Sequence, residues 1–472
     1  MANQLNPPPA GPNLDLGLKN QWWTPRLAGP VVFAAVARFA FLAVALARTG
    51  TSAVLGTDTY SYLIPGRNLV LHGAFFADGV PALMRTPGYP LFLALTSLAG
   101  FTLAAVVNLI LSLFCLVLIW RFARAVSADE RIAVGAAWLL AIEPISSIFS
   151  VVLLSETLFV AFLLFGMERL AWFLRSHRLG VLAVGGFSLV AATFVRPVGY
   201  YLPIALAIGL VVVLARVKDL RWKAPVVLLI TVLPWLAAWQ IRNKVETGYS
   251  GFSSARELNL YTQNGVEVTA KLQHRNYFDV REEFGYAPFV EHSGQTYLSQ
   301  PYVDRHREQA GWTQAQRIAF MGAEGKRIIR AHPGVYVRTC IQPLFAMVLD
   351  PGAGYFGRML GLEGNQLSNG VAKEGAVRWA IFLVKTYPGL VALKLAFEAV
   401  LLALYLLALR GILRGSIRNP YLALMLGTVL YFVAVCAVAG GTGSDARYRI
   451  PIMPFVCVFA AAGPPGKKTA AA

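Results

Sequence analysis

Residues 102–120 read TLAAVVNLILSLFCLVLIW, a run in which no side chain is charged. An α-helix rises about 1.5 Å per residue, so a run of this length reaches about 28 Å, close to the hydrocarbon thickness of a bilayer. The segment is therefore predicted to be a membrane-spanning helix.

Further apolar runs of the same kind lie on both sides of it. The predicted spans are 28–49, 102–120, 132–150, 156–174, 180–195, 199–217, 222–241, 388–409, 420–440 and 448–464. Two more runs leave open whether they cross the membrane: 87–100 is short and is expected to be partly inserted or re-entrant, and Arg338 interrupts 334–350. The pattern predicts an all-α polytopic membrane protein with about 10–12 transmembrane helices.

The composition supports this fold class. Of the 472 residues, 57% are hydrophobic and 14% are charged, whereas soluble domains carry about 25% charged residues. In a soluble protein the formal net charge of +18 would suggest a nucleic-acid partner. Here many basic residues lie in short loops between apolar runs, and no base-stacking motif accompanies them. We therefore expect membrane lipids as partners, and no nucleic acid.

The basic loops predict the orientation, because short loops rich in Lys and Arg stay in the cytoplasm. They follow the second, fourth, sixth, eighth and last predicted spans, so all lie on one side if the N-terminus is cytoplasmic. We expect a multi-pass protein of the inner membrane with both termini cytoplasmic. Its predicted parts are a tail 1–27, a transmembrane catalytic module 28–241 with a first outer loop 50–87, an extracytoplasmic lid segment 242–387, C-terminal transmembrane helices 388–464 and a tail 465–472.

Two charged residues of the first outer loop are candidates for chemistry. Asp58 precedes an apolar set with helical spacing, where its carboxylate would either cap that helix or act as a base at the membrane surface. Arg85 stands before the apolar run that begins at Pro87. A guanidinium there would either grip a phosphate or extend to the polar interface.

Two glutamates lie within or beside predicted spans, where carboxylates are costly and usually face a polar cavity. Glu156 follows Ser155 at the outer turn before the fourth span, and we favour a functional role for it over a helix-start carboxylate. Glu143 precedes Pro144 inside the third span, where a functional role and the stabilisation of a kink are evenly balanced.

Arginines also stand at the outer ends of spans, against the usual bias of basic residues toward the cytoplasm. An anionic lipid phosphate supplies a physical reason for cations on this face. With Asp58, Arg85 and Glu156 they predict one shared site on the outer side. These arginines are Arg196, Arg242, Arg447 and Arg449.

Sequence motifs of several other chemistries are absent. The chain has no H-E-x-x-H, G-x-S-x-G, Walker or D-x-D motif, and its four cysteines form no C-x-x-C pair. A soluble nucleotide-sugar enzyme and an ATP-driven pump are therefore disfavoured. The sequence indicates no metal site and no certain cofactor, and it does not exclude a divalent metal.

One ordered set of short segments carries a family resemblance. The segments are Asp58-x-Tyr60 with Gly73, Arg85-x-Pro87-Gly88-Tyr89-Pro90-Leu91-Phe92, Ser155-Glu156-Thr157-Leu158-Phe159, Arg196-Pro197, Arg242-Asn243, Asn259-Leu260-Tyr261 with Asn264-Gly265, and Arg447-Tyr448-Arg449-x-Pro451. Together they resemble the polyprenyl-phosphate-sugar-dependent glycosyltransferases of the GT-C superfamily, especially the protein O-mannosyltransferase and lipid A aminoarabinose transferase group. The resemblance runs from the first predicted span to the last.

The resemblance implies an extracytoplasmic cavity, a polyprenyl-phosphate-sugar donor and inversion at the anomeric carbon. Asp58 matches the family's acidic catalytic position and would act as general base toward an acceptor hydroxyl. Arg85, Arg447 and Arg449 would contact the donor phosphate. Many relatives carry a second acid where this chain has Thr59, so a single base is expected. Roles in sugar binding or in supporting the site are implied for Tyr60, Glu156, Arg196, Arg242, Asn259 and Asn264.

Two other functions stay open. A transporter or lipid-linked-oligosaccharide flippase would often be built from repeated halves with broken helices in matching places. The sequence shows no such symmetry, and its charged candidates gather at one face. A polysaccharide polymerase or ligase would share the topology, and the sequence does not name the sugar, the acceptor (lipid, polysaccharide or protein) or the oligomeric state.

Overall fold

The computed structural model describes residues 21–127, 129–285, 298–361, 376–415, 419–440 and 446–462. Within these ranges the chain is almost wholly helical, with one pair of two-residue strands. Six of the described helices are long and apolar enough to cross a membrane. The predicted class, an all-α polytopic membrane protein, is confirmed.

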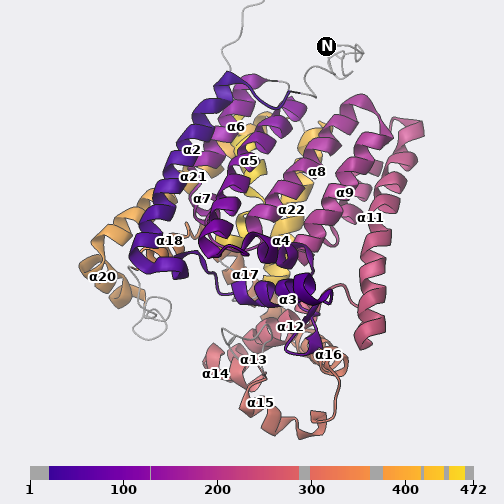
Figure 1. The fold of residues 1–472 in the computed structure, drawn as a ribbon, viewed down its shortest axis with the longest axis vertical. Coiled ribbons are helices and arrows are strands. Elements are labelled where there is room, and N and C mark those ends of the chain that lie inside the picture. Colours follow the sequence, from indigo (N-terminus) through magenta and orange to yellow (C-terminus); the bar gives the residue numbers. More distant parts are fainter. Residues whose placement is uncertain are drawn as a thin grey trace, which may run out of the picture.

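The six long helices form the bundle in the upper part of Figure 1, and all of them coincide with predicted spans. They are α2 (Pro25–Thr49), α5 (Phe101–Ser127), α8 (Glu156–Ser176), α11 (Lys218–Thr247), α21 (Pro388–Arg414) and α22 (Pro420–Gly440). Two shorter apolar helices, α9 (Leu179–Val195) and α10 (Leu202–Val213), pack against α11 and are joined by η2 (Pro197–Gly199).

Two predicted spans take another form. The run 132–150 divides into α6 (Glu130–Ile142) and α7 (Pro144–Phe149), because Pro144 has no amide hydrogen and the extended Glu143 caps the second helix. The run 448–464, described as far as residue 462, contains the end of a 3-10 turn, η6 (Ala446–Arg449), and the nine-residue α23 (Met453–Ala461). α23 is buried against α6 and α21, and a helix enclosed by protein need not cross the bilayer by itself.

The first outer loop is folded. It contains η1 (Gly50–Val54), α3 (Thr59–His72), the antiparallel strands β1 (Phe76–Ala77) and β2 (Val80–Pro81), and α4 (Gly88–Thr96). α3 packs along α4 at one end of the bundle (Figure 1). The run 87–100 thus gives α4, a nine-residue helix that is too short to span a bilayer.

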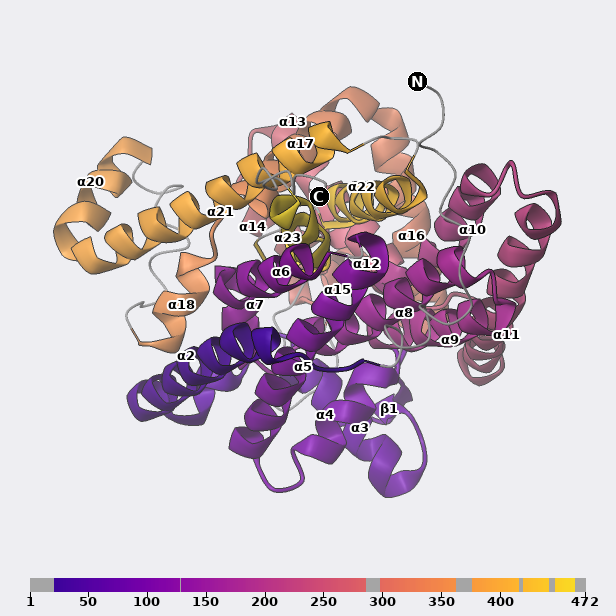
Figure 2. The same ribbon diagram turned by 90° about the horizontal axis from the view of Figure 1, so that it is seen from above.

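The described parts of the long segment after α11 are also mainly helical. Figure 1 shows its first helices beyond the end of the bundle, and Figures 1 and 2 both show α20 to one side. Its elements are α12 (Ala255–Asn259), the π-helix η3 (Leu260–Gly265), α13 (Val266–Gln273), α14 (Tyr277–Glu283), α15 (Gln300–Arg305), η4 (Arg307–Gln309), α16 (Gln314–Ala331), α17 (Pro333–Leu349), α18 (Ala353–Met359) and α20 (Ala376–Thr386). The run 334–350 is the helix α17.

A buried ion network joins α5 to α8. Glu168 Oε1 accepts hydrogen bonds from Arg121 Nη2 at 2.8 Å, Arg169 Nη2 at 2.6 Å and Trp172 Nε1 at 3.1 Å, and its Oε2 accepts one from Arg169 Nε. Arg121 also donates to the carbonyl of Gln21 at 2.7 Å. These residues, the inner network, fix the segment before α2 to the bundle. Residues 1–20 and 465–472 of the predicted tails lie outside the described residues.

Candidate active site

Five charged side chains meet at the helix ends that the sequence predicts to face outward, and we call them the outer cluster. Asp58 lies between two arginines, with Oδ1 3.1 Å from Arg85 Nη2 and Oδ2 3.0 Å from Arg447 Nη1. Glu156 Oε1 is ion-paired with Arg196 and lies 3.5 Å from Arg447 Nε. Arg447 therefore links the two carboxylates, and one charged group forms from segments far apart in sequence.

The turn before α3 places Asp58 in this cluster. Thr59 Oγ1 accepts a hydrogen bond from Gly56 N at 2.8 Å and donates to the carbonyl of Leu153 at 3.0 Å. This bond fixes the turn beside the segment that leads into Glu156. Asp58 is the N-cap residue of α3, yet its side chain makes no capping hydrogen bond. The capping interpretation of Asp58 is therefore wrong, and its carboxylate serves the two arginines.

One face of α3 positions Arg85. Ser61 and Tyr62 lie three and four residues after Asp58, so the three share a helix face. Arg85 Nε donates to Ser61 Oγ at 3.0 Å and Arg85 Nη1 donates to the Tyr62 hydroxyl at 3.1 Å. The guanidinium carbon also lies 4.3 Å from the centre of the Tyr62 ring, a cation–π distance. Arg85 is thus held in a fixed orientation.

The start of α8 positions Glu156 and Arg196. Ser155, the residue before α8, makes no capping bond with its side chain. Its Oγ instead lies 3.3 Å from the Tyr62 hydroxyl and accepts a hydrogen bond from Arg196 Nη1 at 3.4 Å. Glu156 is only 2% exposed, while the Arg196 side chain is 13% exposed. The Arg196 side chain is therefore accessible to a ligand, while the buried Glu156 carboxylate holds it in place.

The charges around Asp58 set its pKa. Burial of the carboxyl raises the pKa, but the positive charges of Arg85 and Arg447 outweigh burial and lower the pKa of Asp58 to about 2. The carboxylate is therefore ionised throughout the physiological range. In this arrangement it is a weak base, because an efficient general base has a pKa near the working pH.

Several buried polar atoms on the segments around the cluster have no hydrogen-bond partner in the described part of the chain. They are Glu156 Oε2, Tyr89 OH and Thr86 Oγ1. Unsatisfied polar groups are costly in a protein interior, and in a native structure they often mark a place for a ligand or water. A small cavity of about 150 Å³ borders Ser61 and Arg85. The outer cluster therefore has both free polar atoms and adjoining space.

Arg449 and Glu143 belong to a different group. Arg449 is fully buried and donates to the carbonyl of Met347 at 3.1 Å and to that of Asp350, and its Nη2 lies 3.9 Å from Glu143 Oε1. Glu143 accepts hydrogen bonds from the first amides of α7. The stabilising role therefore describes Glu143. The structure does not bring Arg449 into the outer cluster, so its predicted contact with phosphate lacks geometric support.

Tyr60 and Arg242 make contacts with residues that do not belong to the outer cluster. The Tyr60 ring packs edge-on against Phe101, with ring centres 6.4 Å apart. Arg242 Nη2 donates to the carbonyl of Phe75 at 3.2 Å, and its guanidinium lies 5.0 Å from the ring centre of Trp239. Arg242 thus ties the end of α11 to the first outer loop. Their roles in sugar binding stay predictions.

The two predicted asparagines flank or belong to the π-helix η3. Asn264 is buried and donates to the carbonyl of Val438 at 2.9 Å, which joins η3 to α22. Asn259, the residue before η3, is half-buried. π-Helical turns occur often at functional sites. The hydrogen bond of Asn264 leads to α22 and not to the outer cluster, and the roles of both asparagines also stay predictions.

Three partners of the cluster were missed by the sequence reasoning: Ser61, Tyr62 and Ser155. Helical spacing from Asp58 could have indicated the first two, and the position next to Glu156 could have indicated the third. Within the described residues, no group of three or more His, Cys, Asp or Glu side chains is placed to hold a metal ion.

Comparisons with known proteins give fold-level similarities. No protein family profile and no curated protein matches the sequence. The chain is similar to the Archaeoglobus fulgidus oligosaccharyltransferase in the apo form, with 13% identity and a TM-score of 0.47 over 93% of this chain and 50% of that one. It is also similar to ArnT from Cupriavidus metallidurans in the apo state, with 14% identity and a TM-score of 0.37 over 92% of this chain and 77% of that one.

The chain spans about half the length of the archaeal oligosaccharyltransferase. That protein has also been solved in complex with an inhibitory peptide and a dolichol-phosphate, at 12% identity and a TM-score of 0.43 to this chain. All three of these similarities have TM-scores below 0.5. At these scores they establish neither an activity nor a family.

Proposed function

We propose that this protein is an inverting membrane glycosyltransferase that moves a sugar from a polyprenyl-phosphate carrier to an acceptor at the extracytoplasmic face. The observation that carries the proposal is the convergence of Asp58 and Glu156 with three arginines in one partly open cluster. These side chains come from segments far apart in the sequence, yet they share ion-pair partners.

The charge balance of the outer cluster favours an anionic ligand. Three arginines face two carboxylates, which leaves one positive charge in excess. The phosphodiester that links a sugar to a polyprenyl carrier has one negative charge and would neutralise it. Guanidinium groups suit this ligand because their planar N–H groups match phosphate oxygens. Arg85 and Arg447, each with 16% side-chain exposure, are the best placed to reach it.

Donor binding would then activate Asp58. A phosphate bound to Arg85 and Arg447 would offset part of the positive charge that lowers the pKa of Asp58. This pKa would therefore rise toward the working pH. Asp58 accepts the proton of the acceptor hydroxyl while that oxygen bonds to the anomeric carbon. The bond from the anomeric carbon to the phosphate oxygen breaks, and its electron pair leaves with the polyprenyl phosphate. The arginines stabilise this leaving charge.

In this scheme Glu156 is a positioning residue. It holds Arg196 and Arg447 without facing the reacting atoms, since only 2% of its surface is exposed. Attack from the side opposite the phosphate inverts the anomeric centre. The reaction needs little acid assistance, because a phosphate is already a good leaving group.

The test is transfer by the purified full chain in nanodiscs. Envelope lipids that carry radiolabelled polyprenyl-phosphate-sugar are supplied with a crude envelope acceptor fraction. We expect label to move from lipid to acceptor, and an Arg447→Gln variant to lose at least about a hundredfold in rate. Intact labelled lipid that crosses proteoliposome membranes without cleavage would refute the transferase and support the flippase.

A further inference from the structure

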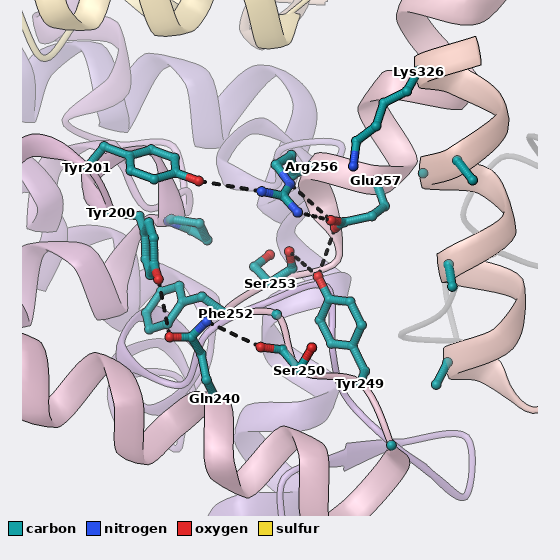
Figure 3. A pocket seen from close by; sticks show the side chains of 17 residues that line it. Tyr200, Tyr201, Gln240, Tyr249, Ser250, Phe252, Ser253, Arg256, Glu257 and Lys326 are labelled. Atoms are coloured by element: carbon teal, nitrogen blue, oxygen red, sulfur yellow. Dashed lines mark hydrogen bonds and ion pairs between the residues drawn. The ribbon is translucent and has the colours of Figure 1, made fainter. Parts of the chain in front are cut away.

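A second, larger cavity is lined by residues that follow Arg196 in the chain and by residues of α11, α12 and α16 (Figure 3). It has a volume of about 520 Å³ and lies between η2, the end of α11, α12 and one face of α16. This size is in the range of small-molecule sites. We call it the aromatic cavity.

The walls of the aromatic cavity combine ring faces with flat polar groups. Tyr200, Tyr201 and Phe252 form one aromatic wall, with ring centres 4.8 Å apart for the two tyrosines and 5.1 Å for Tyr200 and Phe252. Gln240 and Tyr249 add an amide and a hydroxyl (Figure 3). Such amphipathic walls suit a ligand with apolar C–H faces and a rim of hydroxyls.

The polar groups of the cavity are already ordered. Tyr200 OH donates to Gln240 Oε1 at 3.2 Å, and Tyr249 OH donates to Glu257 Oε2 at 2.8 Å. Arg256 Nε donates to Glu257 Oε1 at 2.9 Å. Side chains held in this way lose little conformational entropy when a ligand binds. The cavity is therefore pre-organised for hydrogen bonding through side chains.

Small residues of α16 leave the space open. Ala315, Ala319, Gly322 and Ala323 line the cavity from this helix, followed by Lys326. A Cβ atom at Gly322 would lie 2.8 Å from Glu257 Cγ, so a larger residue there would displace the glutamate. The face of α16 is thus shaped around the polar groups that it meets.

The aromatic cavity adjoins the outer cluster along the chain on two sides. Pro197 lines the cavity and directly follows Arg196 of the cluster. Ser253 also lines the cavity, and its Oγ donates to the carbonyl of Met84, the residue before Arg85. A molecule in the cavity would therefore lie beside the arginines proposed to hold the donor phosphate.

We infer that the aromatic cavity binds a sugar ring of the acceptor, so that the acceptor is a glycan or the glycan head group of a lipid. This inference rests on the proposed function. A protein acceptor fits less well, because extended peptides are commonly bound along a strand edge. Here the described polar groups of the cavity are mostly side chains. An alkyl chain fits less well too, because Arg256, Glu257 and Lys326 would be left facing it.

The test compares two substitutions of the same kind on α16. Ala319→Phe fills the cavity, while Ala331→Phe adds the same ring at an exposed position that does not line it. Ala319 is exposed as well, so both variants should fold. The probes are the methyl glycosides and disaccharides of glucose, galactose, mannose and N-acetylglucosamine. Their binding to the full chain in nanodiscs is measured by saturation-transfer NMR.

We expect saturation of the ring protons of at least one probe with the wild type and with Ala331→Phe, and a loss of at least about tenfold with Ala319→Phe. Undecaprenyl phosphate binding, measured in parallel, should be unchanged in all three. If the wild type does not bind undecaprenyl phosphate, the proposed function itself is refuted. No sugar signal in the wild type, an equal signal in both variants, or saturation of a Ser/Thr-rich peptide alone would overturn the inference.

Discussion

Helix α8 carries one buried glutamate at its first residue, Glu156, and another near its middle, Glu168, and the two differ in how their oxygens are used. Both oxygens of Glu168 accept hydrogen bonds in the inner network. In the outer cluster, Glu156 Oε1 faces two arginines, while no described residue forms a hydrogen bond with Oε2. The two glutamates lie about 18 Å apart along the helix axis. Identical residue types thus build a closed structural network near the middle of the helix and an open site at its start.

The comparison teaches that burial of charge alone does not mark a site. The inner network has its glutamate oxygens satisfied by Arg121, Arg169 and Trp172. Within the described residues, the outer cluster keeps partly exposed arginines and one unsatisfied carboxylate oxygen, Glu156 Oε2, and a small cavity borders Arg85. Unsatisfied groups beside a hollow are the feature that distinguishes a ligand site from a structural ion network.

The largest expected effect is on catalysis at Asp58. Asp58→Asn removes the proposed base while keeping an isosteric side chain between Arg85 and Arg447. We expect transfer to fall by about 10²–10⁴-fold, the usual contribution of a general base, with the protein still folded in the membrane. Initial rates in nanodiscs measure this. The control is Asp129→Asn at the N-cap of α6, and full activity of Asp58→Asn would refute the base.

The next effect separates the two glutamates by stability. Glu168→Gln places an amide NH₂ against N–H donors, because both glutamate oxygens accept hydrogen bonds, and should cost about 3–5 kcal/mol. Glu156→Gln loses the charge that faces Arg196 and Arg447, but it can turn its NH₂ to the position of the unsatisfied Oε2, so it should cost less, about 1.5–2 kcal/mol. Denaturant unfolding in detergent compares them. Equal losses would remove the distinction between the networks.

A smaller effect is expected on donor affinity. Arg85→Lys and Arg447→Lys keep the positive charge but lose the forked geometry of the guanidinium. The donor KM should rise about tenfold, which corresponds to the loss of roughly one hydrogen bond to a charged group. Arg169→Lys is the matched change in the inner network and should leave the donor KM unchanged. Saturation curves for the donor test all three. A higher donor KM for Arg169→Lys alone would place the phosphate elsewhere.

The smallest expected effect is that of acid on the free enzyme. A carboxyl whose pKa is lowered on folding stabilises the protein above its unfolded pKa, and this contribution is lost as the pH falls through the folded value, here about 2. The same low pKa keeps the Asp58 carboxylate ionised in the free enzyme over the working pH range. We therefore expect kcat/KM to show no acid limb from Asp58 between pH 8 and pH 5. Because donor binding raises this pKa, kcat should show an acid limb at higher pH than kcat/KM. Coincident limbs in the two profiles would argue against this activation.

The sequence predicted the fold class well because long apolar runs have few alternatives to spanning helices. It failed where protein replaces lipid around a segment, as in the short α23, and where Pro144 breaks the helix between α6 and α7. Apolar composition cannot distinguish a helix surrounded by lipid from one surrounded by protein.

The sequence also placed Asp58, Arg85, Glu156, Arg196 and Arg447 in one outer group. It grouped Arg449 with Arg447 because they lie two residues apart. The 3-10 turn η6 sends their side chains to different partners, Asp58 for Arg447 and Glu143 for Arg449. The aromatic cavity was not foreseen, since its walls come from α11, α12 and α16, and their contacts depend on tertiary packing.

The central claim is that the outer cluster, and not the inner network, holds the lipid phosphate. Native mass spectrometry of undecaprenyl phosphate retained by the purified chain tests it directly, in the wild type, in Arg85→Gln/Arg447→Gln and in Arg169→Gln. We expect the wild type and Arg169→Gln to retain the lipid equally and the double variant to lose at least about a hundredfold in affinity. Equal retention by all three proteins would contradict the claim.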